Sequence, residues 1–394
     1  MPVVVFFAPG QVFSTTSRSA GGSFSRWARS AGAAARSKQN DAMNRRAENF
    51  TGGAEEASGS VPSVQSVVKV IMPRPTVAIV CPREFKFTDH EASIERPVLG
   101  EVADVTTVWL GFNDPFPAEV LGADALILWH GPLVTADVVA GLKRCRAIVR
   151  NGVGFDSVDL AAATRAGIPV CNVPDYGTEE VADHALALTL ALYRQLFPLD
   201  AEAKRLGWRI TVQHRMRRLN TQTFGIVGLG RIGTAAALRA KAFGFRVVFF
   251  DPHVPAGTHK ALGLERVGTL AELLARADTV SIHCPLTAET RGMIGEREIA
   301  AMRPGAFLVN TARGDVVRKA PLLAALRAGH LGGAGLDVVE DEPLRTADEA
   351  ATPNLIVTCH AAFCSPEGMV EMRTTSARIA RAAILGEPVW NRVN

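Results

Sequence analysis

The sequence predicts an α/β protein with two doubly wound parallel-sheet domains and a cleft between them. Short apolar runs alternate with segments of helical spacing, and this alternation calls for parallel sheets covered by helices. The alternation occurs in two series along the chain. A length of 394 residues is enough for two domains of ordinary size, each with its own buried core.

Residues 1–73 differ from the rest of the chain, because they are rich in Ser, Ala, Gly and Arg and show little periodicity. Two interpretations stay open. The Arg-rich, acid-poor start resembles an organelle transit peptide. Alternatively, the true start is Met72, directly ahead of an apolar run. We favour the second interpretation and expect 1–73 to be a disordered or mis-assigned extension without chemistry.

The first series of strands follows this extension. Segments of helical spacing, such as 135–143 and 159–167, separate its apolar runs. A long helix over 178–196 comes next, with Thr178 as its expected N-cap and two glutamates in its first turn. This helix is apolar over much of its circumference, so we expect it to be buried between domains or subunits. The strands of the first series are expected at 76–81, 105–110, 124–129, 146–150 and 168–171.

The second series has clear helix signals. Thr269, with Glu272 three residues later, forms a capping box ahead of an apolar helical segment. The last helix should begin at Ser365, with Pro366 in its first turn. The strands of this series are expected at 223–228, 246–250, 278–283, 306–310, 332–337 and 355–358.

Composition and charge exclude several classes of function. Hydrophobic residues make up 47% and charged residues 21%, as in a soluble globular protein. A net charge of +4 is too small to argue for direct nucleic-acid binding. No long apolar stretch is free of charge, so we expect no membrane partner. The six cysteines form no Cys-x-x-Cys pair and no zinc-type spacing, so we expect reduced thiols, a cytoplasmic location and no metal site.

A glycine-rich turn follows the first strand of the second series. Gly228 permits a tight turn, Gly230 lets the backbone approach a pyrophosphate, and Gly233 allows close packing of helix on strand. The helix that follows offers free N–H groups and a partial positive charge to the phosphates. The cofactor-binding residues of this turn are therefore Gly228, Gly230, Arg231, Ile232 and Gly233.

Asp251 ends the next strand, 23 residues after Gly228, where a carboxylate can bind a ribose 2′-hydroxyl. Taken alone, Asp251 fits a turn-forming aspartate ahead of Pro252 equally well. The glycines and the strand–helix–strand context favour the ribose contact. Because this carboxylate would repel a 2′-phosphate, we predict NAD as the cofactor in preference to NADP.

An arginine, a carboxylate and a histidine follow later strands in NTARGD (310–315), DVVEDEP (337–343) and TCHAAF (358–363). At these motifs the chain resembles the D-isomer-specific 2-hydroxyacid dehydrogenases, and within that family the branch of the C-terminal binding proteins. The resemblance extends over nearly all of 76–394. It also rests on RNGVGFDSVD (150–159), CNVPDYGTEEVADHAL (171–186), GLGRIG (228–233), ALRAKAFGF (237–245), HCPLT (283–287) and GLDV (335–338).

The resemblance implies that Arg313, Glu342 and His360 are the catalytic residues. A guanidinium can bind the carboxylate of a 2-keto acid with a planar fork of donors. A protonated imidazole can deliver a proton to the ketone oxygen as hydride arrives, and a carboxylate beside it favours its charged form. Taken singly, each of the three fits an ordinary loop residue better. Their joint placement after successive strands favours the catalytic set.

The resemblance also implies contacts to cofactor and substrate. Asp337 matches the position that holds the nicotinamide carboxamide, while Cys284 fits a small apolar residue beside a turn nearly as well. The loop that begins at Arg150 either presents backbone N–H groups to the substrate carboxylate or only shapes a turn, and both interpretations stay open. The remaining expected cofactor contacts are Thr178, Cys284, Pro285, Thr311, Ala312 and Asp337, and the expected substrate contacts are Arg150, Gly152, Val153, Gly154 and Phe363.

The resemblance therefore implies an NAD-dependent oxidoreductase, acting on the CH–OH group, that interconverts a small 2-keto acid and a D-2-hydroxy acid as a homodimer. It assigns 74–177 and 366–394 to a flavodoxin-like substrate domain and 178–365 to a Rossmann NAD-binding domain. One alternative is an NAD(H)-sensing transcriptional corepressor, as in animal members of the branch. A second is a pseudoenzyme, which the intact catalytic set argues against.

Overall fold

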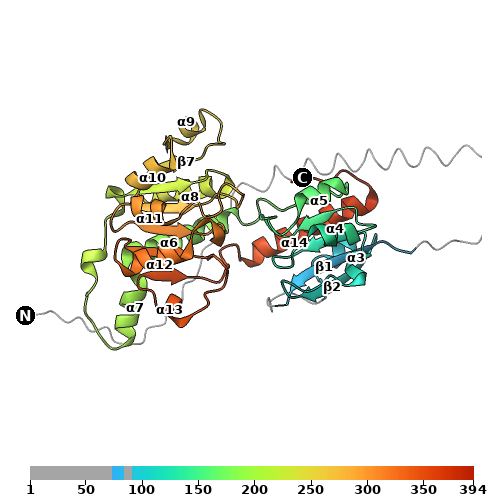
Figure 1. Cartoon of the computed structure of the whole chain (residues 1–394), viewed down its shortest axis with the longest axis horizontal. Helices are drawn as coiled ribbons and strands as arrows, with labels where there is room; N and C mark the ends of the chain where they lie inside the picture. The colour runs from blue at the N-terminus through green and yellow to red at the C-terminus, as the bar shows by residue number, and fades with distance from the viewer. Residues whose placement is uncertain (1–72, 84–90) are drawn as a thin grey trace, which may run out of the picture. The chain divides into compact units, whose positions relative to one another are not determined.

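The computed structural model describes residues 73–83 and 91–394, so the extension predicted over 1–73 lies outside the described residues except for Pro73. Figure 1 shows helices packed around two sheets in this part of the chain. All strand pairs within both sheets are parallel. The predicted α/β class, with two doubly wound parallel sheets, is confirmed.

The first sheet has the strand order β2-β1-β3-β4-β5, which is the flavodoxin-like order. Its central strands β1, β3 and β4 are almost wholly buried, with helices on both faces. This burial explains why they appear in the sequence as continuous apolar runs rather than as alternating patterns. The elements are β1 (Thr76–Pro82), α2 (Arg96–Leu99), β2 (Asp104–Leu110), α3 (Ala118–Leu121), β3 (Ala125–Leu128), α4 (Ala136–Gly141), β4 (Ile148–Arg150), α5 (Leu160–Arg165) and β5 (Val170–Cys171).

The last helix, α14 (Pro366–Leu385), packs on the first sheet although it is the most distant element in the chain. Figure 1 shows it in red among the elements of that sheet. Its start agrees with the prediction: Ser365 Oγ accepts the N–H of Gly368 at 2.9 Å, and Pro366 is the first helical residue. Within its buried face, the Arg373 guanidinium binds both carboxylate oxygens of Glu95, at 2.6 and 2.7 Å. This bidentate pair satisfies two charges that would be costly to bury alone.

The second sheet has the order β12-β11-β10-β9-β6-β7-β8, in which β6 to β11 follow the Rossmann pattern 3-2-1-4-5-6. Strand β8, only two residues long, was missed by the sequence prediction because Glu265 and Arg266 form no apolar run. The strands are β6 (Thr223–Val227), β7 (Arg246–Phe250), β8 (Glu265–Arg266), β9 (Thr279–Ile282), β10 (Phe307–Asn310), β11 (Gly333–Leu336) and β12 (Leu355–Val357). The helices are α6 (Thr178–Arg194), α7 (Leu196–Lys204), α8 (Arg231–Ala242), α9 (Thr258–Leu262), α10 (Leu270–Arg276), α11 (Glu296–Ala301), α12 (Lys319–Arg327) and α13 (Ala347–Ala350), with 3-10 turns at Gln213–Arg215, Leu219–Thr221 and Gly314–Val316.

Helix α6 corrects the expectation for Thr178. The capping position is Gly177, and Thr178 is already helical because its N–H closes a turn on the carbonyl of Asp175 at 3.1 Å. The helix is buried against β10, β11 and α8 of its own sheet. Glycines in β11 permit this approach, since a Cβ at Gly335 would lie 2.9 Å from Leu188 Cβ. The side-chain cap predicted for α10 is present: Thr269 Oγ1 accepts the N–H of Glu272 at 3.1 Å.

Both sheets join strands at their amino ends through the same pairing of an aspartate with a threonine. Thr76, which begins β1, donates its N–H to Oδ2 of Asp124 at 2.9 Å, and Asp124 directly precedes β3. Thr223, which begins β6, donates its N–H to Oδ2 of Asp278 at 2.8 Å, and Asp278 directly precedes β9. An arginine contacts the carboxylate in each sheet; these are Arg144 in the first and Arg303 in the second.

The remaining composition-based expectations concern membranes and thiols. Across residues 73–83 and 91–394, no helix is both long and apolar enough to cross a membrane. All six cysteines lie in the described part of the chain, and each is free there. Burial raises the pKa of Cys81 and Cys145 to about 12, so these thiols stay neutral and act as small apolar core groups.

Candidate active site

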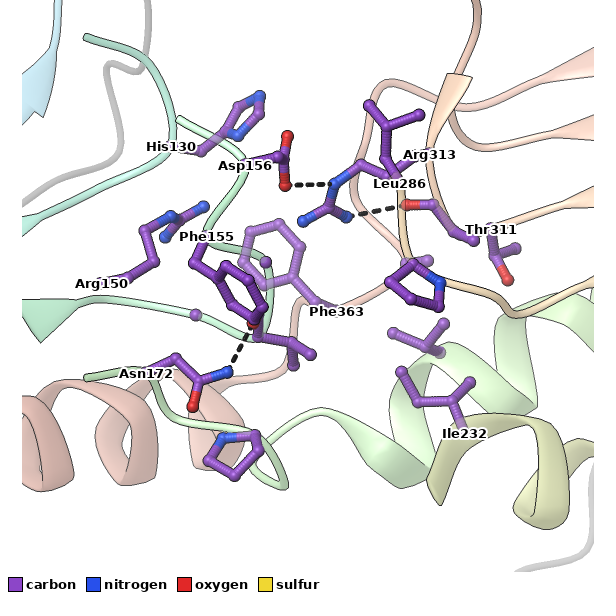
Figure 2. A pocket seen from close by; sticks show the side chains of 18 of the residues that line it. His130, Arg150, Phe155, Asp156, Asn172, Ile232, Leu286, Thr311, Arg313 and Phe363 are labelled. Carbon is purple, nitrogen blue, oxygen red and sulfur yellow. Dashed lines mark hydrogen bonds and ion pairs between the residues drawn. The ribbon is translucent and has the colours of Figure 1, made fainter. Parts of the chain in front are cut away.

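The carboxyl ends of both sheets contribute loops to one cavity of about 380 Å³ (Figure 2). Loops after β3, β4 and β5 line one side of it. Loops after β6, β9, β10, β11 and β12 line the other side. Ligands of open parallel sheets bind outside the carboxyl ends of the strands. The cavity therefore lies where the topology predicts a binding site.

The glycine turn between β6 and α8 has the form that a phosphate site needs. Gly228 has a φ of 90°, and a Cβ there would lie 2.7 Å from the backbone nitrogen of Cys284. A Cβ at Gly233 would lie 2.0 Å from the carbonyl oxygen of Gly228, so helix and turn are in direct contact. Around Gly230, which precedes α8, a Cβ would meet nothing within 4 Å. The start of α8 thus borders open space, as an anion site at a helix N-terminus requires.

Asp251 follows β7 and is tied to the glycine turn. Its Oδ2 accepts the N–H of Leu229 at 2.8 Å, while its Oδ1 accepts the N–H of His253 at 2.8 Å. The carboxylate therefore shapes its own turn, as one interpretation predicted. It also lies beside the glycines, and its contact to a ribose stays a prediction. An arginine lies close as well: Arg266 of β8 donates to the backbone oxygen of Asp251 at 2.8 Å. The sequence prediction missed this neighbour together with the strand that carries it.

Arg313 follows β10 in a turn that Asn310 holds. The Asn310 amide donates to the carbonyl of Arg313 at 2.9 Å and accepts the N–H of Ala312 at 3.0 Å. The Nε of Arg313 donates to Oδ1 of Asp156 at 3.0 Å, across the cavity (Figure 2). Burial alone would raise the pKa of Asp156, but the charge and hydrogen bond of Arg313 outweigh it and hold that pKa below its usual range.

Glycines in the loop after β4 leave space for guanidinium groups. A Cβ at Gly154 would lie 1.3 Å from Nη2 of Arg313, and a Cβ at Gly152, whose φ is 141°, would lie 2.8 Å from Nη1 of Arg150. The sequence left two roles open for this loop, which were binding of the substrate carboxylate and formation of a turn. Space for the guanidinium groups is a third reason for its glycines. Arg150 itself is buried, and burial together with the charge of Arg313 lowers its pKa to about 10. Its guanidinium still carries a positive charge at neutral pH.

His360 and Glu342 form a pair beside the cavity. Nδ1 of His360 lies 3.0 Å from Oε2 of Glu342, and 19% of the imidazole is exposed. Because Nδ1 faces the carboxylate, Nε2 is the nitrogen left for a ligand. His360 has a φ of 53°, a conformation that costs a non-glycine residue about 1–3 kcal/mol and needs support from its surroundings.

Asp337 supplies that support from the end of β11. Its carbonyl accepts the N–H of His360 at 2.9 Å. Its carboxylate accepts the N–H groups of Ala361 and Ala362, each at 2.9 Å, and the hydroxyl of Thr358 at 2.5 Å. Asp337 is buried and lines the cavity. It therefore positions the loop that carries His360, in addition to the cofactor contact that the resemblance implies.

His130, which the sequence prediction did not select, faces His360 from the other side of the cavity. The two ring centroids are 4.7 Å apart, and the planes are tilted by 52°. Burial lowers the pKa of His130 to about 3, and the neighbouring His360, Arg150 and Arg313 act in the same direction. The imidazole is thus neutral at physiological pH. In the sequence, His130 could have been selected as a site residue because it comes directly after a buried strand and Trp129.

The structure brings most of the predicted residues to the cavity. Those that line it are Arg150, Gly152, Val153, Gly154, Gly230, Arg231, Ile232, Cys284, Pro285, Thr311, Ala312, Arg313, Asp337, His360 and Phe363. Those that do not line it are Thr178, Gly228, Gly233, Asp251 and Glu342, the last of which contacts the cavity-lining His360. The prediction missed several cavity residues, among them Trp129, His130, Asp156, Tyr176 and His283.

Two polar atoms on the glycine-turn side of the cavity are free to bind a cofactor. Thr311 Oγ1 and His283 Nδ1 are buried, and neither has a hydrogen-bond partner among the described residues. Burial lowers the pKa of His283 to about 4, so its ring is neutral. Buried polar groups almost always have partners, and a ligand is one way to supply them. Together with the open start of α8, these groups fit a dinucleotide.

Comparisons with known proteins identify relatives of this chain. Residues 186–362 match the family model described as "D-isomer specific 2-hydroxyacid dehydrogenase, NAD binding domain". The chain is 38% identical over 296 residues to a D-3-phosphoglycerate dehydrogenase from Mycobacterium tuberculosis. That match covers 75% of this chain and 56% of the relative, so the chain spans little more than half of the relative's length.

Two solved structures are similar over most of the chain. The TT0316 protein from Thermus thermophilus is 34% identical, with a TM-score of 0.70, and the match covers 81% of this chain and 100% of that one. A D-lactate dehydrogenase from Aquifex aeolicus, complexed with NAD and lactic acid, is 29% identical with a TM-score of 0.71. Here the match covers 79% of this chain and 96% of the other.

Proposed function

The chain belongs to the D-isomer-specific 2-hydroxyacid dehydrogenase family, and from this premise we propose that it is an NAD-dependent oxidoreductase acting on the CH–OH group. It interconverts a small 2-keto acid and the D-2-hydroxy acid. The observation that carries this proposal is the His360–Glu342 pair, 3.0 Å apart, beside two arginines of the same cavity.

Arg313 binds the substrate carboxylate. Its Nε and Nη1 donate to Asp156 and to the carbonyl of Ala312, at 3.0 and 2.8 Å, which holds the plane of the guanidinium. Among the described residues its Nη2 donates to no acceptor, so this edge is available to an anion. The charge of Arg150 adds to the attraction, because Asp156 offsets only one of the two positive charges. Two arginines and one aspartate thus leave a site that favours a monoanion.

His360 transfers the proton. In reduction its Nε2, protonated, donates a proton to the ketone oxygen as negative charge develops there. In oxidation the neutral ring accepts the hydroxyl proton. Glu342, hydrogen-bonded to Nδ1, keeps the ring oriented with Nε2 toward the substrate. NADH, when bound, would supply the hydride.

The second sheet holds the cofactor. The glycine turn and the start of α8 would hold the pyrophosphate, and the Asp251 carboxylate would accept hydrogen bonds from the ribose. Thr311 and Asp337 line the same cavity as Arg313 and His360, and we assign them to the nicotinamide end of the cofactor. The Asp251 carboxylate disfavours a 2′-phosphate, so NADH is the preferred reduced cofactor.

NADH oxidation across a panel of 2-keto acids tests this function. The panel contains glyoxylate, hydroxypyruvate, pyruvate and bulkier 2-keto acids, and NADPH is run in parallel. We expect turnover with at least one keto acid, and higher kcat/KM with NADH than with NADPH. Absence of turnover across the panel, with NADH binding intact, would remove the enzyme proposal and leave a nucleotide-binding protein.

The domain organisation follows from the same proposal. Residues 74–177 with 366–394 form the substrate domain, and 178–365 form the NAD-binding domain. Support comes from α14, whose buried residues share a core with the first sheet. Closure of the two domains on the ligand would exclude water from the hydride path.

A homodimer is the assembly that we propose. The predicted interface helix, α6, is buried on its own sheet, so the contact must use other residues. Large apolar side chains on and after α7 are exposed; they are Leu196, Phe197, Leu206, Trp208 and Ile210. Such exposure is typical of a protein interface. Light scattering should give a dimer mass, and a Leu206→Ser, Trp208→Ser variant should shift it toward the monomer.

The cellular location and the branch of the family are narrower proposals. Six free cysteines support a reducing compartment such as the cytoplasm. The placement within the C-terminal binding protein branch stays a prediction. Nothing in 73–83 or 91–394 favours the corepressor alternative, and we do not propose it.

A further inference from the structure

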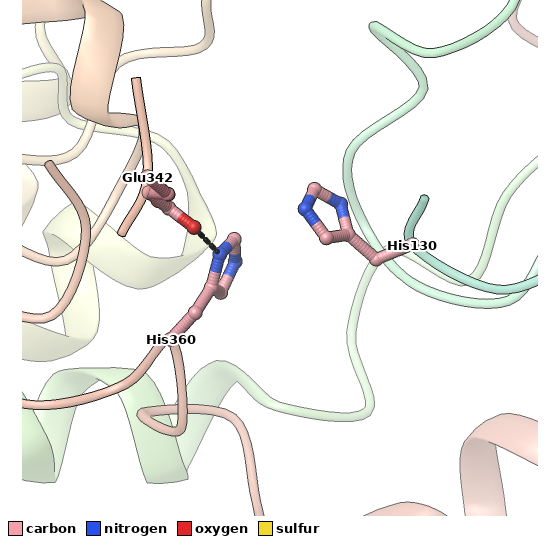
Figure 3. A group of neighbouring side chains, drawn as sticks. All are labelled: His130, Glu342 and His360. Atoms are coloured by element: carbon pink, nitrogen blue, oxygen red, sulfur yellow. Dashed lines mark hydrogen bonds and ion pairs between the residues drawn. The ribbon is translucent and has the colours of Figure 1, made fainter. Parts of the chain in front are cut away.

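Three side chains able to bind a metal ion lie close together at the cavity: His130 and His360 line it, and Glu342 contacts His360. His130 follows β3 of the first sheet, whereas Glu342 and His360 follow β11 and β12 of the second. Figure 3 shows the His130 imidazole facing the Glu342–His360 pair across an open gap. One ligand atom from each residue lies within 4.8 Å of the other two.

The distances are close to those of a metal site. Zinc binds nitrogen and oxygen ligands at about 2.0–2.2 Å, so two ligands of a tetrahedral ion lie about 3.3 Å apart. Glu342 Oε2 and His360 Nδ1 are already 3.0 Å apart. The ligand nitrogen of His130 lies at most 4.8 Å from the ligand atoms of Glu342 and His360. These distances would need to shorten by about 1.5 Å, which small side-chain rotations or closure of the cavity can supply.

The charges of the cavity permit a cation. Metal ligands must be deprotonated, so the two imidazoles would bind the ion as neutral rings and Glu342 as a carboxylate. Arg150 and Arg313 would repel a cation, but the carboxylates of Asp156 and Glu342 balance these two charges. When Glu342, a proposed ligand of the ion, is counted with Asp156, the two arginines and two carboxylates carry no net formal charge.

We propose that His130, Glu342 and His360 form a binding site for a divalent transition-metal cation, with Zn²⁺ as the best match. Two imidazoles and one carboxylate are a common zinc ligand set that leaves one coordination position open. Mg²⁺ and Ca²⁺ prefer oxygen ligands and fit this set poorly. The site was not visible in the sequence because its ligands come from three distant segments.

The bound ion acts as an inhibitor. It coordinates Nδ1 of His360 in place of the hydrogen bond to Glu342, and the proposed function needs that pair intact for proton transfer. It also links His130 on one side of the cavity to His360 on the other. Binding of the ion itself depends only on the three ligands and not on the proposed function. The site would stand even if no keto acid were turned over.

Isothermal titration of the full chain with ZnCl₂ tests the site. We expect one Zn²⁺ per chain, and an affinity at least about tenfold lower in both His130→Asn and His360→Gln. His253→Asn, which removes an exposed histidine elsewhere, should bind Zn²⁺ as the unmodified chain does. MgCl₂ at the same concentrations should show no binding. Retained NADH binding in each variant would demonstrate that it is folded.

A double variant excludes the nearby thiols. Cys359 and Cys364 are exposed and flank the loop of His360, so they are the main competing zinc ligands. Zinc affinity should be unchanged in Cys359→Ser, Cys364→Ser. Loss of binding there, or unchanged affinity in His130→Asn, would overturn the proposed site. Inactivity of the metal-free chain on all keto acids would instead count against the enzyme proposal alone.

Discussion

At its amino end, each sheet joins the first residue of one strand to an aspartate that precedes a neighbouring strand. Thr76 and Asp124 do this in the first sheet, and Thr223 and Asp278 in the second. The carboxyl ends differ. In the second sheet, side chains such as that of Asp337 bind loop N–H groups. In the first sheet, the loop after β4 contains glycines, and their lack of a side chain leaves space for guanidinium groups.

The comparison separates stability from chemistry. The aspartate pairings lie at the ends opposite the cavity and can contribute only to holding strands together. The loops at the carboxyl ends place guanidinium, imidazole and carboxylate groups within reach of one ligand. Substitutions at the two ends should therefore have different consequences, which four measurements can examine.

The largest effect is expected for His360→Gln, on the cavity side of the second sheet. The variant loses the proposed proton donor, and a group of this kind typically contributes about 10²–10⁴ in rate. NADH binding should be largely unchanged because the glycine turn is untouched. Steady-state kinetics together with NADH fluorescence titration measure the two quantities. A near-normal kcat would defeat the assignment of His360.

The next effect is expected for Gly154→Ala, on the opposite side of the cavity. The new Cβ would lie 1.3 Å from Arg313 Nη2, so the guanidinium must move. Misplacement of a binding group by about 1 Å can cost about 10²-fold in turnover. The control is Gly268→Ala, whose Cβ would meet only a carboxylate oxygen at 3.8 Å. Equal kcat/KM for the two variants would contradict the role given to the glycine.

Asp124→Asn should lower stability without changing the site. Burial opposes ionisation of Asp124, but its bonds to Arg144 and Thr76 lower its pKa below the usual value. A lost hydrogen bond to a charged group costs about 1.5–3 kcal/mol. Because the folded-state pKa is lowered, this stabilisation is full above the unfolded-state pKa of about 3.9 and is lost as pH falls through the folded value.

Urea unfolding of Asp124→Asn at neutral and at acidic pH measures this dependence. The difference from the unmodified chain should shrink on acidification, while KM for NADH at neutral pH stays constant. Asp278→Asn is the matched variant in the second sheet and should also lower stability at neutral pH. A change in the KM for NADH in either variant would contradict the view that the amino ends of the sheets affect stability alone.

The smallest effect is expected for Asp251→Ala. This variant tests whether a carboxylate at the carboxyl end of the second sheet selects the cofactor or only forms a turn. Removal of the carboxylate should raise the kcat/KM of NADPH relative to NADH by about tenfold, equivalent to about 1.4 kcal/mol. Arg266 lies beside this position and would then favour a phosphate. An unchanged ratio would assign Asp251 to turn formation alone.

Much of the fold was predictable because it depends on local periodicity. The apolar runs of the buried strands and the cap at Ser365 follow from residues close in the sequence. Strand β8 was not predictable, because two polar residues at a sheet edge form no pattern. The expected cap at Thr178 was wrong because a turn from Asp175 makes that residue helical.

The site was predictable only in part. The glycine turn has a local signature, and Arg313, Glu342 and His360 were found through motifs. Asp156 and His130 were missed because nothing beside them in the chain indicates what they contact. The same holds for Gly154, whose function depends on a guanidinium that arrives from the other sheet.

By itself the sequence determined the order of strands and helices, the phosphate-type turn and the stock of reactive side chains, since backbone preferences and hydrophobic periodicity act over a few residues. Only the tertiary structure decided that Asp156 binds Arg313, 157 positions away, and that His130 faces His360. Such contacts depend on how two separately formed sheets pack. Packing of that kind is the sum of many weak contacts between residues that are distant in the sequence, and such contacts leave no local pattern.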